Sequence, residues 1–393
     1  MKWFVPGRLE VLGKHTDYAG GRSLLAAVDR GVTVVLEDAT SGITATTTAS
    51  PRMFSTLDGT LPRGHWGNYV QAVVDRLVLN FGELKPAHLS FDSDLSLASG
   101  MSSSSALVVA TALSLIEHND LRCRPQWQRN IRTDIDLAGY MACFENGLSF
   151  GSLEGVRGVG TFGGSEDHTA MLLCKPDQLT EFSFCPIVEG RSVDFLPEWS
   201  FVVAVSGVLA EKTGSALELY NRASLRTREI VAAWNRATGR DDQVVADALG
   251  SSKDAQDSLR AVVAHSSDLS TRLRAFLTES EELIPAALDA LAVRDVEAFG
   301  LISDASQRNA EEHLGNQVPE TSFLQRSARE LGAVAAAGFG AGFGGSVWAL
   351  LPADQAEDFS VRWLERYTAR FPTAAAGALT MVTRPGGPAR RLG

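Results

Sequence analysis

The segment Gly100-Met101-Ser102-Ser103-Ser104-Ser105-Ala106 leads directly into an apolar run from Leu107 to Leu115. A glycine-serine turn before a helix presents unpaired backbone N–H groups at the positive end of the helix dipole, and this arrangement binds phosphate. The segment lacks the Lys-Ser/Thr of a Walker-type P-loop. A serine-rich N-cap on an ordinary buried helix has the same composition. The segment therefore predicts a buried helix, and it leaves a cap and a phosphate site as alternatives for the turn.

Length and charge limit the class of protein. The chain has 393 residues, more than the roughly 250–300 at which single cores stop growing, so two domains are expected. The net charge of -11 argues against an extended polyanion such as nucleic acid as the main partner. No apolar run approaches the ~18 residues of a membrane helix, and Cys123, Cys143, Cys174 and Cys185 show no CxxC spacing. These features predict a reduced, cytoplasmic protein with no membrane partner.

Hydrophobic patterns predict strands and helices that mix without a regular βαβ repeat, which favours an α+β fold. Strands are expected at residues 32–37, 42–48, 88–91, 169–173, 201–205, 346–351 and 379–384. Helices are expected at residues 68–81, 102–117, 133–145, 211–236, 321–337 and 354–370, and helical patterns dominate 244–314. Residues 186–197 are expected to connect two domains, which we place at residues 1–190 and 191–393.

The N-terminal segment from Pro6 to Tyr18, PGRLEVLGKHTDY, concentrates polar side chains between glycines. Arg8, Lys14, His15 and Asp17 are together able to hydrogen-bond several hydroxyls of a sugar. A solvated turn with an internal Lys14–Asp17 ion pair explains the same residues. The segment alone does not decide between a sugar site and a turn.

Two further glycine-rich segments carry chemistry. Gly163-Gly164-Ser165-Glu166-Asp167-His168 places two acids and a histidine after a glycine-rich loop, which suits a general base, although a simple cap formed by Ser165 and Asp167 is the alternative. Residues 338–345, GFGAGFGG, contain five glycines before an expected strand. That is more than a hairpin needs, so the backbone is expected to approach a ligand closely.

Three of these segments occur in the order and approximate spacing of the GHMP small-molecule kinases. They are the N-terminal GR…G-x-H-x-D-Y, the central G-x-S-S-S and the late G-x-G-F-G-G. The first segment resembles the galactokinase branch, whose members read close to PGRVNLIGEHTDY. The resemblance extends from Pro6 to Leu351. It implies a two-domain α+β fold with ATP and substrate in the cleft between the domains.

The resemblance also implies roles for individual residues. Asp167 matches the aspartate of the family's MDQ and would be the catalytic base, with Arg8 beside it lowering its pKa and stabilising the transferred phosphoryl group. The implied substrate-binding residues are Lys14, His15, Asp17, Gly164 and Tyr220. The implied ATP-binding residues are Gly100, Met101, Ser102, Ser103, Ser104, Ser105, Gly342 and Gly344. Ser104 and Glu145 are the implied Mg²⁺ ligands.

The implied activity is ATP-dependent phosphorylation of the anomeric hydroxyl of galactose or a related monosaccharide. The implied cofactors are ATP and Mg²⁺, and the expected assembly is a monomer or a homodimer. A homoserine- or mevalonate-type kinase is disfavoured by the HTDY segment. A sugar- and ATP-sensing regulator without turnover is the alternative of another class, and the retention of both Arg8 and Asp167 argues against it.

The chain departs from the family motif at two positions of the N-terminal segment. Lys14 replaces the glutamate before the histidine, and Glu10 replaces the asparagine after Arg-x. Lys14 would suit a sugar with a carboxylate, such as a uronic acid, and arabinose is a further alternative. If Lys14 instead pairs with Glu10, galactose remains acceptable. A third departure, His168 for the family's glutamine, keeps a hydrogen-bond donor.

Overall fold

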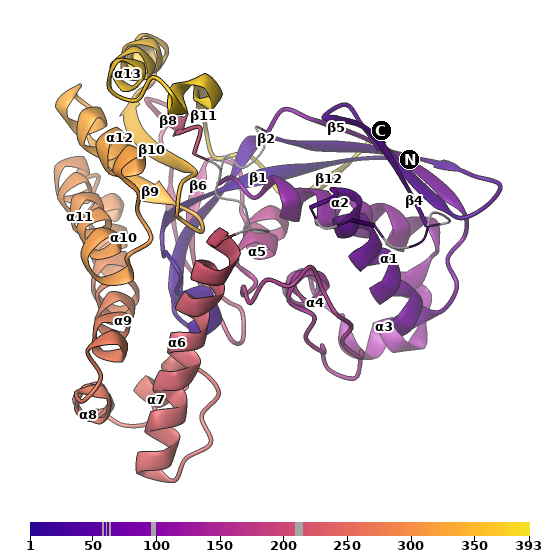
Figure 1. Ribbon diagram of the computed structural model, residues 1–393, viewed down its shortest axis with the longest axis horizontal. Helices are drawn as coiled ribbons and strands as arrows, with labels where there is room; N and C mark the ends of the chain where they lie inside the picture. The colour runs from indigo at the N-terminus through magenta and orange to yellow at the C-terminus, as the bar shows by residue number, and fades with distance from the viewer. Residues whose placement is uncertain (57–58, 60, 63, 96–99, 209–214) are drawn as a thin grey trace.

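Two β-sheets organise the protein, which was analysed as a computed structural model (Figure 1). The structure describes residues 1–393 except 57–58, 60, 63, 96–99 and 209–214. The larger sheet contains β1 (Lys2–Leu12), β2 (Arg22–Asp38), β3 (Ile43–Thr47), β4 (Ser50–Ser55), β5 (Ala87–Ser93), β6 (Gln178–Ser183), β7 (Val188–Asp194) and β12 (Arg390–Leu392). Its strand order is β12-β1-β2-β5-β3-β4, and β6 joins β2 to β7. The β3–β5 pair is parallel and the others are antiparallel.

The smaller sheet is antiparallel and lies in the second half of the chain. It contains β8 (Trp199–Val205), β9 (Ala335–Phe339), β10 (Ser346–Pro352) and β11 (Leu379–Thr383), in the order β11-β8-β10-β9. The two sheets meet at Trp348 of β10. Its indole Nε1 donates to the Val11 carbonyl at 3.2 Å, and its ring stacks on Phe299 at 6.0 Å. This contact fixes the end of β1 against the second half of the chain.

The helices of the first half cover one face of the larger sheet (Figure 1). They are α1 (Gly67–Phe81), α2 (Ser103–His118), α3 (Pro125–Asn130), α4 (Asp134–Asn146) and α5 (Glu166–Leu173). The α2 helix packs on β1, β2, α1, α4 and α5. A helix enclosed in this way is apolar on nearly all sides, which explains the uninterrupted run from Leu107 to Leu115.

The remaining helices belong to the second half, where α9 to α12 lie beside the smaller sheet, α13 lies at the top of the view, and α6 and α7 form a separate run below the sheets (Figure 1). They are α6 (Ser215–Thr238), α7 (Val245–Gly250), α8 (Ala255–Val263), α9 (Ser267–Leu277), α10 (Ile284–Ala292), α11 (Val296–Asn309), α12 (Pro319–Glu330) and α13 (Ala356–Arg370). Short π-helical segments at Thr278–Leu283 and Ala310–Leu314 extend α9 and α11. Within the described residues, no helix has the length and apolar character needed to span a membrane.

The mixed architecture confirms the expected α+β class, and four local predictions were wrong. Residues 169–173 are helical in α5, residues 188–194 form β7 rather than an open connection, and residues 335–339 form β9 instead of ending a helix. The N-terminal segment up to Leu12 is the buried strand β1 and not a solvated turn. The first four residues of the helix expected at 211–236 lie outside the described residues, and α6 forms the rest.

The division at residue 190 stays a prediction. That point lies inside β7, which pairs with β6 of the larger sheet. The last strand, β12, also returns to this sheet and pairs with β1, so the two ends of the chain lie together (Figure 1).

Candidate active site

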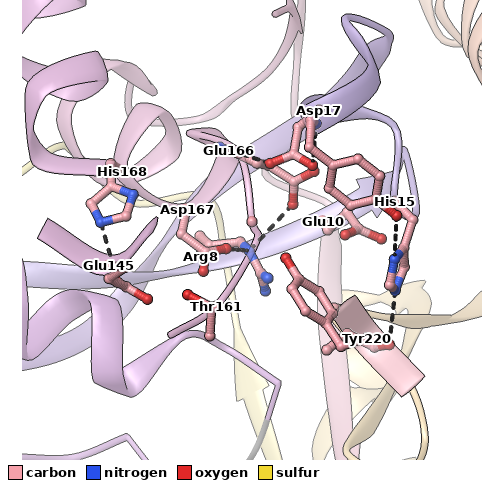
Figure 2. A pocket seen from close by; sticks show the side chains of 15 residues that line it. Arg8, Glu10, His15, Asp17, Glu145, Thr161, Glu166, Asp167, His168 and Tyr220 are labelled. Atoms are coloured by element: carbon pink, nitrogen blue, oxygen red, sulfur yellow. Dashed lines mark hydrogen bonds and ion pairs between the residues drawn. The ribbon is translucent and has the colours of Figure 1, made fainter. Parts of the chain in front are cut away.

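The three glycine-containing segments of the sequence converge on one pocket (Figure 2). Its walls come from β1, the turn after it, α5, α6 and the loop after β9. The lining residues are Arg8, Glu10, His15, Asp17, Tyr18, Glu145, Thr161, Gly163, Gly164, Glu166, Asp167, His168, Tyr220, Gly340 and Ala341. Most of these side chains are polar or charged, which suits a ligand rich in hydroxyls.

The ion pair of Arg8 and Asp167 lies at the centre of the pocket (Figure 2). Arg8 Nε donates to Asp167 Oδ1 at 2.8 Å and lies 3.5 Å from Glu166 Oε1, while its Nη1 donates to the Gly100 carbonyl. Burial would lower the pKa of Arg8, but the surrounding carboxylates outweigh burial and raise it above its ordinary value. The guanidinium is therefore a permanent cation between the strand, α5 and the serine turn.

Asp167 occupies the first turn of α5, where the helix dipole stabilises a negative charge. Its second oxygen, Oδ2, accepts the Ser105 hydroxyl at 3.1 Å. The Oγ of Ser105 and the Nε of Arg8 thus hold the two carboxylate oxygens in one orientation. An oriented carboxylate in a sugar-sized pocket can accept a proton from a bound hydroxyl.

The turn after β1 presents His15 and Asp17. His15 has a left-handed backbone (φ 58°), and its ring bridges the Tyr18 hydroxyl at 2.7 Å and the Ala341 carbonyl at 2.9 Å. The Asp17 carboxylate accepts the N–H groups of Tyr18 and Glu166, and burial raises its pKa. Gly164 packs against it, since a Cβ there would lie 2.4 Å from Asp17 Oδ2. This explains the glycine before the acidic segment.

The glycine-rich stretch after α4 folds back onto the end of that helix. Gly147 ends α4 in the left-handed conformation, and the Glu145 carbonyl accepts the N–H of Val159 at 3.0 Å. On the other side, Asn221 of α6 accepts the N–H of Phe162. The insertion therefore forms a wall of the pocket, and it brings Glu145 Oε1 to 3.2 Å from His168 Nε2.

Lys14 does not line the pocket in the described part of the chain. Its ammonium is buried, donates to the Ser306 hydroxyl at 2.8 Å and lies 3.8 Å from Glu279 Oε1. The predicted Lys14–Asp17 pair is therefore wrong, and neither does the ammonium form an ion pair with Glu10 among the described residues. A direct contact between Lys14 and the sugar is not supported either, because the ammonium contacts Ser306 and Glu279 outside the pocket lining.

Glu10 is the buried acid that the sequence marked only as a departure from the motif. Burial raises its pKa to about 7, although Arg8, Lys14 and a hydrogen bond with Glu166 oppose the rise. Burial also raises the pKa of Glu166 well above its ordinary value. Both acids are therefore more readily protonated than exposed carboxyl groups.

We expect Glu10→Gln to stabilise the protein at alkaline pH. Between pH 4.5, the ordinary value, and about 7, the folded state binds more protons at Glu10 than the unfolded state does, so stability falls as the pH rises. The neutral amide lacks this penalty and should gain about 1–3 kcal/mol at pH 8 and less than half of that at pH 5. Urea unfolding of both proteins at the two pH values measures the difference. Glu297→Gln, an exposed site on α11, should show the pH dependence of the unmodified chain, and a gain for Glu10→Gln that is equal at both pH values would contradict the titration.

A second, larger pocket adjoins the first at Arg8 and Ala341, which line both. It has a volume of about 360 Å³ and is lined by apolar side chains and by the serine turn. The apolar wall consists of Val32, Trp66, Tyr69, Phe91, Leu107 and Phe339. The opposite wall consists of Gly100, Ser102, Ser103, Ser104, Gly342 and Gly345. An apolar slot that ends at a helix N-terminus suits a planar base with attached phosphates.

The serine turn has the geometry that its composition indicated. Ser102 has a left-handed backbone (φ 54°) and forms no side-chain cap, and α2 begins at Ser103. The first N–H groups of a helix have no intrahelical acceptor, so those of the first turn of α2 are available to a ligand. In the late glycine loop that lines the same pocket, Gly342 has a φ of 76°, and a Cβ there would lie 2.3 Å from the Asn316 carbonyl oxygen.

Three residues predicted to bind ATP lie outside the lining of this pocket. Met101 is fully buried, and its carbonyl accepts the N–H of Arg8 at 3.2 Å. Ser105 is buried against Asp167, and Gly344 packs on the Val208 carbonyl. These three residues pack next to residues that line the pocket and do not line it themselves.

The residues that sequence reasoning missed come mostly from distant segments. Trp66 and Tyr69 carry no motif, and only the helical and apolar patterns around them were visible, while Phe339 lies inside the late glycine segment without a role of its own. Tyr18 was inside the quoted segment without a role, yet its hydroxyl holds the His15 ring. Arg272 of α9 donates to the His15 carbonyl at 2.6 Å from 257 residues away, and nothing local in the sequence signals it.

Family models match three parts of the chain. Residues 1–37 match the galactokinase galactose-binding signature, residues 68–146 the GHMP kinases N terminal domain, and residues 287–369 the GHMP kinases C terminal domain. These ranges contain β1, the turn after β1 that carries His15 and Asp17, and the serine turn before α2. The chain belongs to the GHMP kinases. Within them it is a galactokinase-like sugar kinase, as the N-terminal signature indicates.

Relatives and solved structures agree with this assignment. The galactokinases of Chloroflexus aurantiacus and Thermotoga neapolitana are 26% and 24% identical, over 93% and 94% of this chain and 87% and 95% of theirs. A crystal structure of Lactococcus lactis galactokinase complexed with galactose superimposes with a TM-score of 0.81, at 22% identity, over 100% of this chain and 95% of that one. The Methanococcus jannaschii mevalonate kinase shares the fold at a TM-score of 0.60, with 13% identity over 98% of both chains.

Proposed function

We propose that this sugar kinase transfers the γ-phosphate of ATP to the anomeric hydroxyl of galactose, with Asp167 as the base. The observation that carries the proposal is the Arg8–Asp167 pair at the junction of the polar and the apolar pocket. A phosphoryl group must pass between two bound substrates at such a junction. The pair supplies a proton acceptor for one substrate and a cation for the other.

Galactose is assigned to the polar pocket. His15, Asp17 and Tyr220 line it with donors and acceptors for ring hydroxyls, and desolvation raises the pKa of Tyr220 well above its ordinary value, so its hydroxyl stays a neutral donor. The curated relatives are galactokinases, and the Lactococcus lactis enzyme was crystallised with galactose. These findings favour galactose over the other sugars that the sequence left open.

ATP is assigned to the larger pocket. Its apolar wall suits the adenine ring, and the N–H groups at the start of α2 suit the phosphates. In this arrangement the γ-phosphate points toward Arg8, whose Nη1 is already anchored on the Gly100 carbonyl of the serine turn. The guanidinium therefore needs no reorganisation to meet the charge of the transferred group.

Ser104 and Glu145 are the proposed Mg²⁺ ligands. A hydroxyl and a carboxylate are oxygen donors of the kind that Mg²⁺ takes together with substrate phosphates. Among the described residues, no group of three His, Cys, Asp or Glu side chains forms a metal site, which agrees with an ion completed by ATP. When bound, Mg²⁺ would neutralise charge on the phosphates.

The proposed reaction needs positioning more than covalent chemistry. Asp167 accepts the proton of the anomeric hydroxyl as its oxygen attacks the γ-phosphorus in line, and the bond from phosphorus to the leaving oxygen of ADP breaks. Ser105 and Arg8 keep the Asp167 carboxylate in place during this step. The products are the sugar 1-phosphate and ADP.

A coupled ADP-release assay tests the proposal. We expect turnover with galactose and an at least tenfold lower kcat/KM with arabinose, galacturonate, glucuronate and N-acetylgalactosamine. A pocket that hydrogen-bonds the hydroxyls of one sugar binds a sugar that lacks one of these groups, or carries an extra polar group, much less tightly in the transition state. Phosphorus NMR of the product should show an anomeric phosphate. Preferential turnover of a uronic acid would overturn the choice of sugar. Binding of galactose and ATP without any ADP release would instead indicate a sensor.

A further inference from the structure

One pocket residue has no place in the mechanism above. Glu10 follows Arg8 by two positions on β1, so both side chains leave the same face of the strand. Glu10 is 3% exposed and lines the polar pocket, where its carboxyl lies between Arg8 and the His15 ring in the view of Figure 2. Its Oε1 has no hydrogen-bond partner among the described residues.

The charged groups around Glu10 provide a hydrogen-bond partner for only part of its carboxyl group. Arg8 of β1, Lys14 beyond the end of β1, Glu166 of α5 and Glu279 of the segment after α9 all act on it, and Glu166 is the one that hydrogen-bonds to it. Glu166 is itself held from behind, because its Oε2 accepts the Ser23 hydroxyl of β2 at 2.8 Å. The carboxyl pair is therefore anchored on the protein side, while Glu10 Oε1 stays without a donor among the described residues.

A buried carboxyl oxygen without a donor is costly, and native proteins seldom leave one unpaired. Glu10 lines the pocket that is assigned to the sugar. Asp167 serves the hydroxyl that reacts, so the donor for Glu10 must be another group of the same ligand. We propose that Glu10 is a further substrate-binding residue, whose carboxyl group accepts a hydrogen bond from one non-reacting hydroxyl of the sugar ring. The proposal rests on the proposed function, since it requires a sugar in this pocket.

Deoxy sugars combined with variants of Glu10 test this contact. The enzyme and Glu10→Leu are assayed with galactose and with its 2-, 3-, 4- and 6-deoxy analogues, and kcat and KM are measured separately. We expect Glu10→Leu to raise the KM for galactose about 10- to 100-fold, as one hydrogen bond to a charged or strongly polar group is lost, with a smaller effect on kcat. For exactly one deoxy analogue, the KM of the unmodified enzyme should rise by a similar factor relative to galactose. For the same analogue, the KM of Glu10→Leu should rise less than threefold relative to galactose.

Two further variants separate binding from structure. Glu10→Gln keeps an oxygen that accepts the hydrogen bond, so its KM should rise less than that of Glu10→Leu. Ser23→Ala disturbs the same carboxyl pair from behind, at a fully buried position outside the pocket lining. For the deoxy analogue that lacks the hydroxyl bound by Glu10, the KM of Ser23→Ala should rise relative to galactose as much as that of the unmodified enzyme. The Kd for ATP of every variant, measured by calorimetry, should stay within threefold of the unmodified value.

The proposal fails if every deoxy analogue costs the unmodified enzyme and Glu10→Leu the same factor, because Glu10 then acts on the fold and not on the sugar. It also fails if Glu10→Leu leaves the KM for galactose unchanged, in which case water alone satisfies Oε1. Absence of turnover by the unmodified enzyme with every hexose would contradict the proposed function itself. In that case calorimetric titration of galactose into the enzyme and into Glu10→Leu still decides the contact.

Discussion

Replacing Asp167 with asparagine is expected to lower kcat for galactose by about 10²- to 10⁴-fold, which is the contribution of a positioned general base. The amide has the shape of the carboxylate, and its oxygen can still accept the hydrogen bond of Arg8 Nε, while its NH₂ group can donate to Ser105 Oγ in place of the bond that Ser105 donates to Asp167. It cannot take the proton of the attacking hydroxyl. The loss should therefore fall on kcat, with the KM for galactose and for ATP changed much less.

The matched control is Asp289→Asn. Asp289 forms an ion pair of the same length with Arg191, 2.8 Å, but on the surface of α10, so the same chemical change there should leave kcat and KM unaltered. The measurement is steady-state ADP release by the three proteins, with thermal melting to confirm that each is folded. If Asp167→Asn keeps more than a tenth of the activity, the assignment of the base is wrong.

The sequence predicted the elements whose composition follows their burial. The spacing of Val70, Val73 and Leu77 predicted α1, and the apolar run after the serine turn predicted α2. Both predictions were confirmed because these apolar residues are buried in the core. The serine turn itself was ambiguous in the sequence. In the structure it lines one pocket together with the late glycine loop, which no local pattern could indicate.

Predictions failed where function or tertiary packing opposes the local pattern. The N-terminal segment left a solvated turn open because it holds charged side chains between glycines, yet Arg8 is buried in strand β1 since it lines the polar pocket. The alanines of residues 335–337 favour a helix in isolation, but they are fully buried in β9 beside β10, where small side chains let α11 and α12 pack closely. Lys14 is the clearest case, since its partners Ser306 and Glu279 lie more than 260 positions away.

Arg8 is expected to give the second large effect. It is the one arginine or lysine that lines the polar pocket in the described chain, and it faces Glu10, Glu166 and Asp167. Arg8→Lys keeps the charge, but a single ammonium cannot reproduce the fork that reaches Asp167, Glu166 and the Gly100 carbonyl. We expect kcat to fall by about 10²- to 10³-fold, as after loss of one preorganised donor for the transferred phosphoryl group.

Arg8→Met removes the charge as well and separates stability from catalysis. It leaves the Asp167 and Glu166 carboxylates, with 15% and 7% of their side chains exposed, without their cation, and breaking such a pair costs about 3–5 kcal/mol. The loss should be smaller at pH 5 than at pH 8, because protonation removes the uncompensated charge. Adding Glu166→Gln should recover part of the stability and none of the activity. Urea unfolding at both pH values, together with ADP release, measures the two effects, and an Arg8→Lys enzyme with unimpaired kcat would show that charge alone, without the fork, is sufficient for phosphoryl transfer.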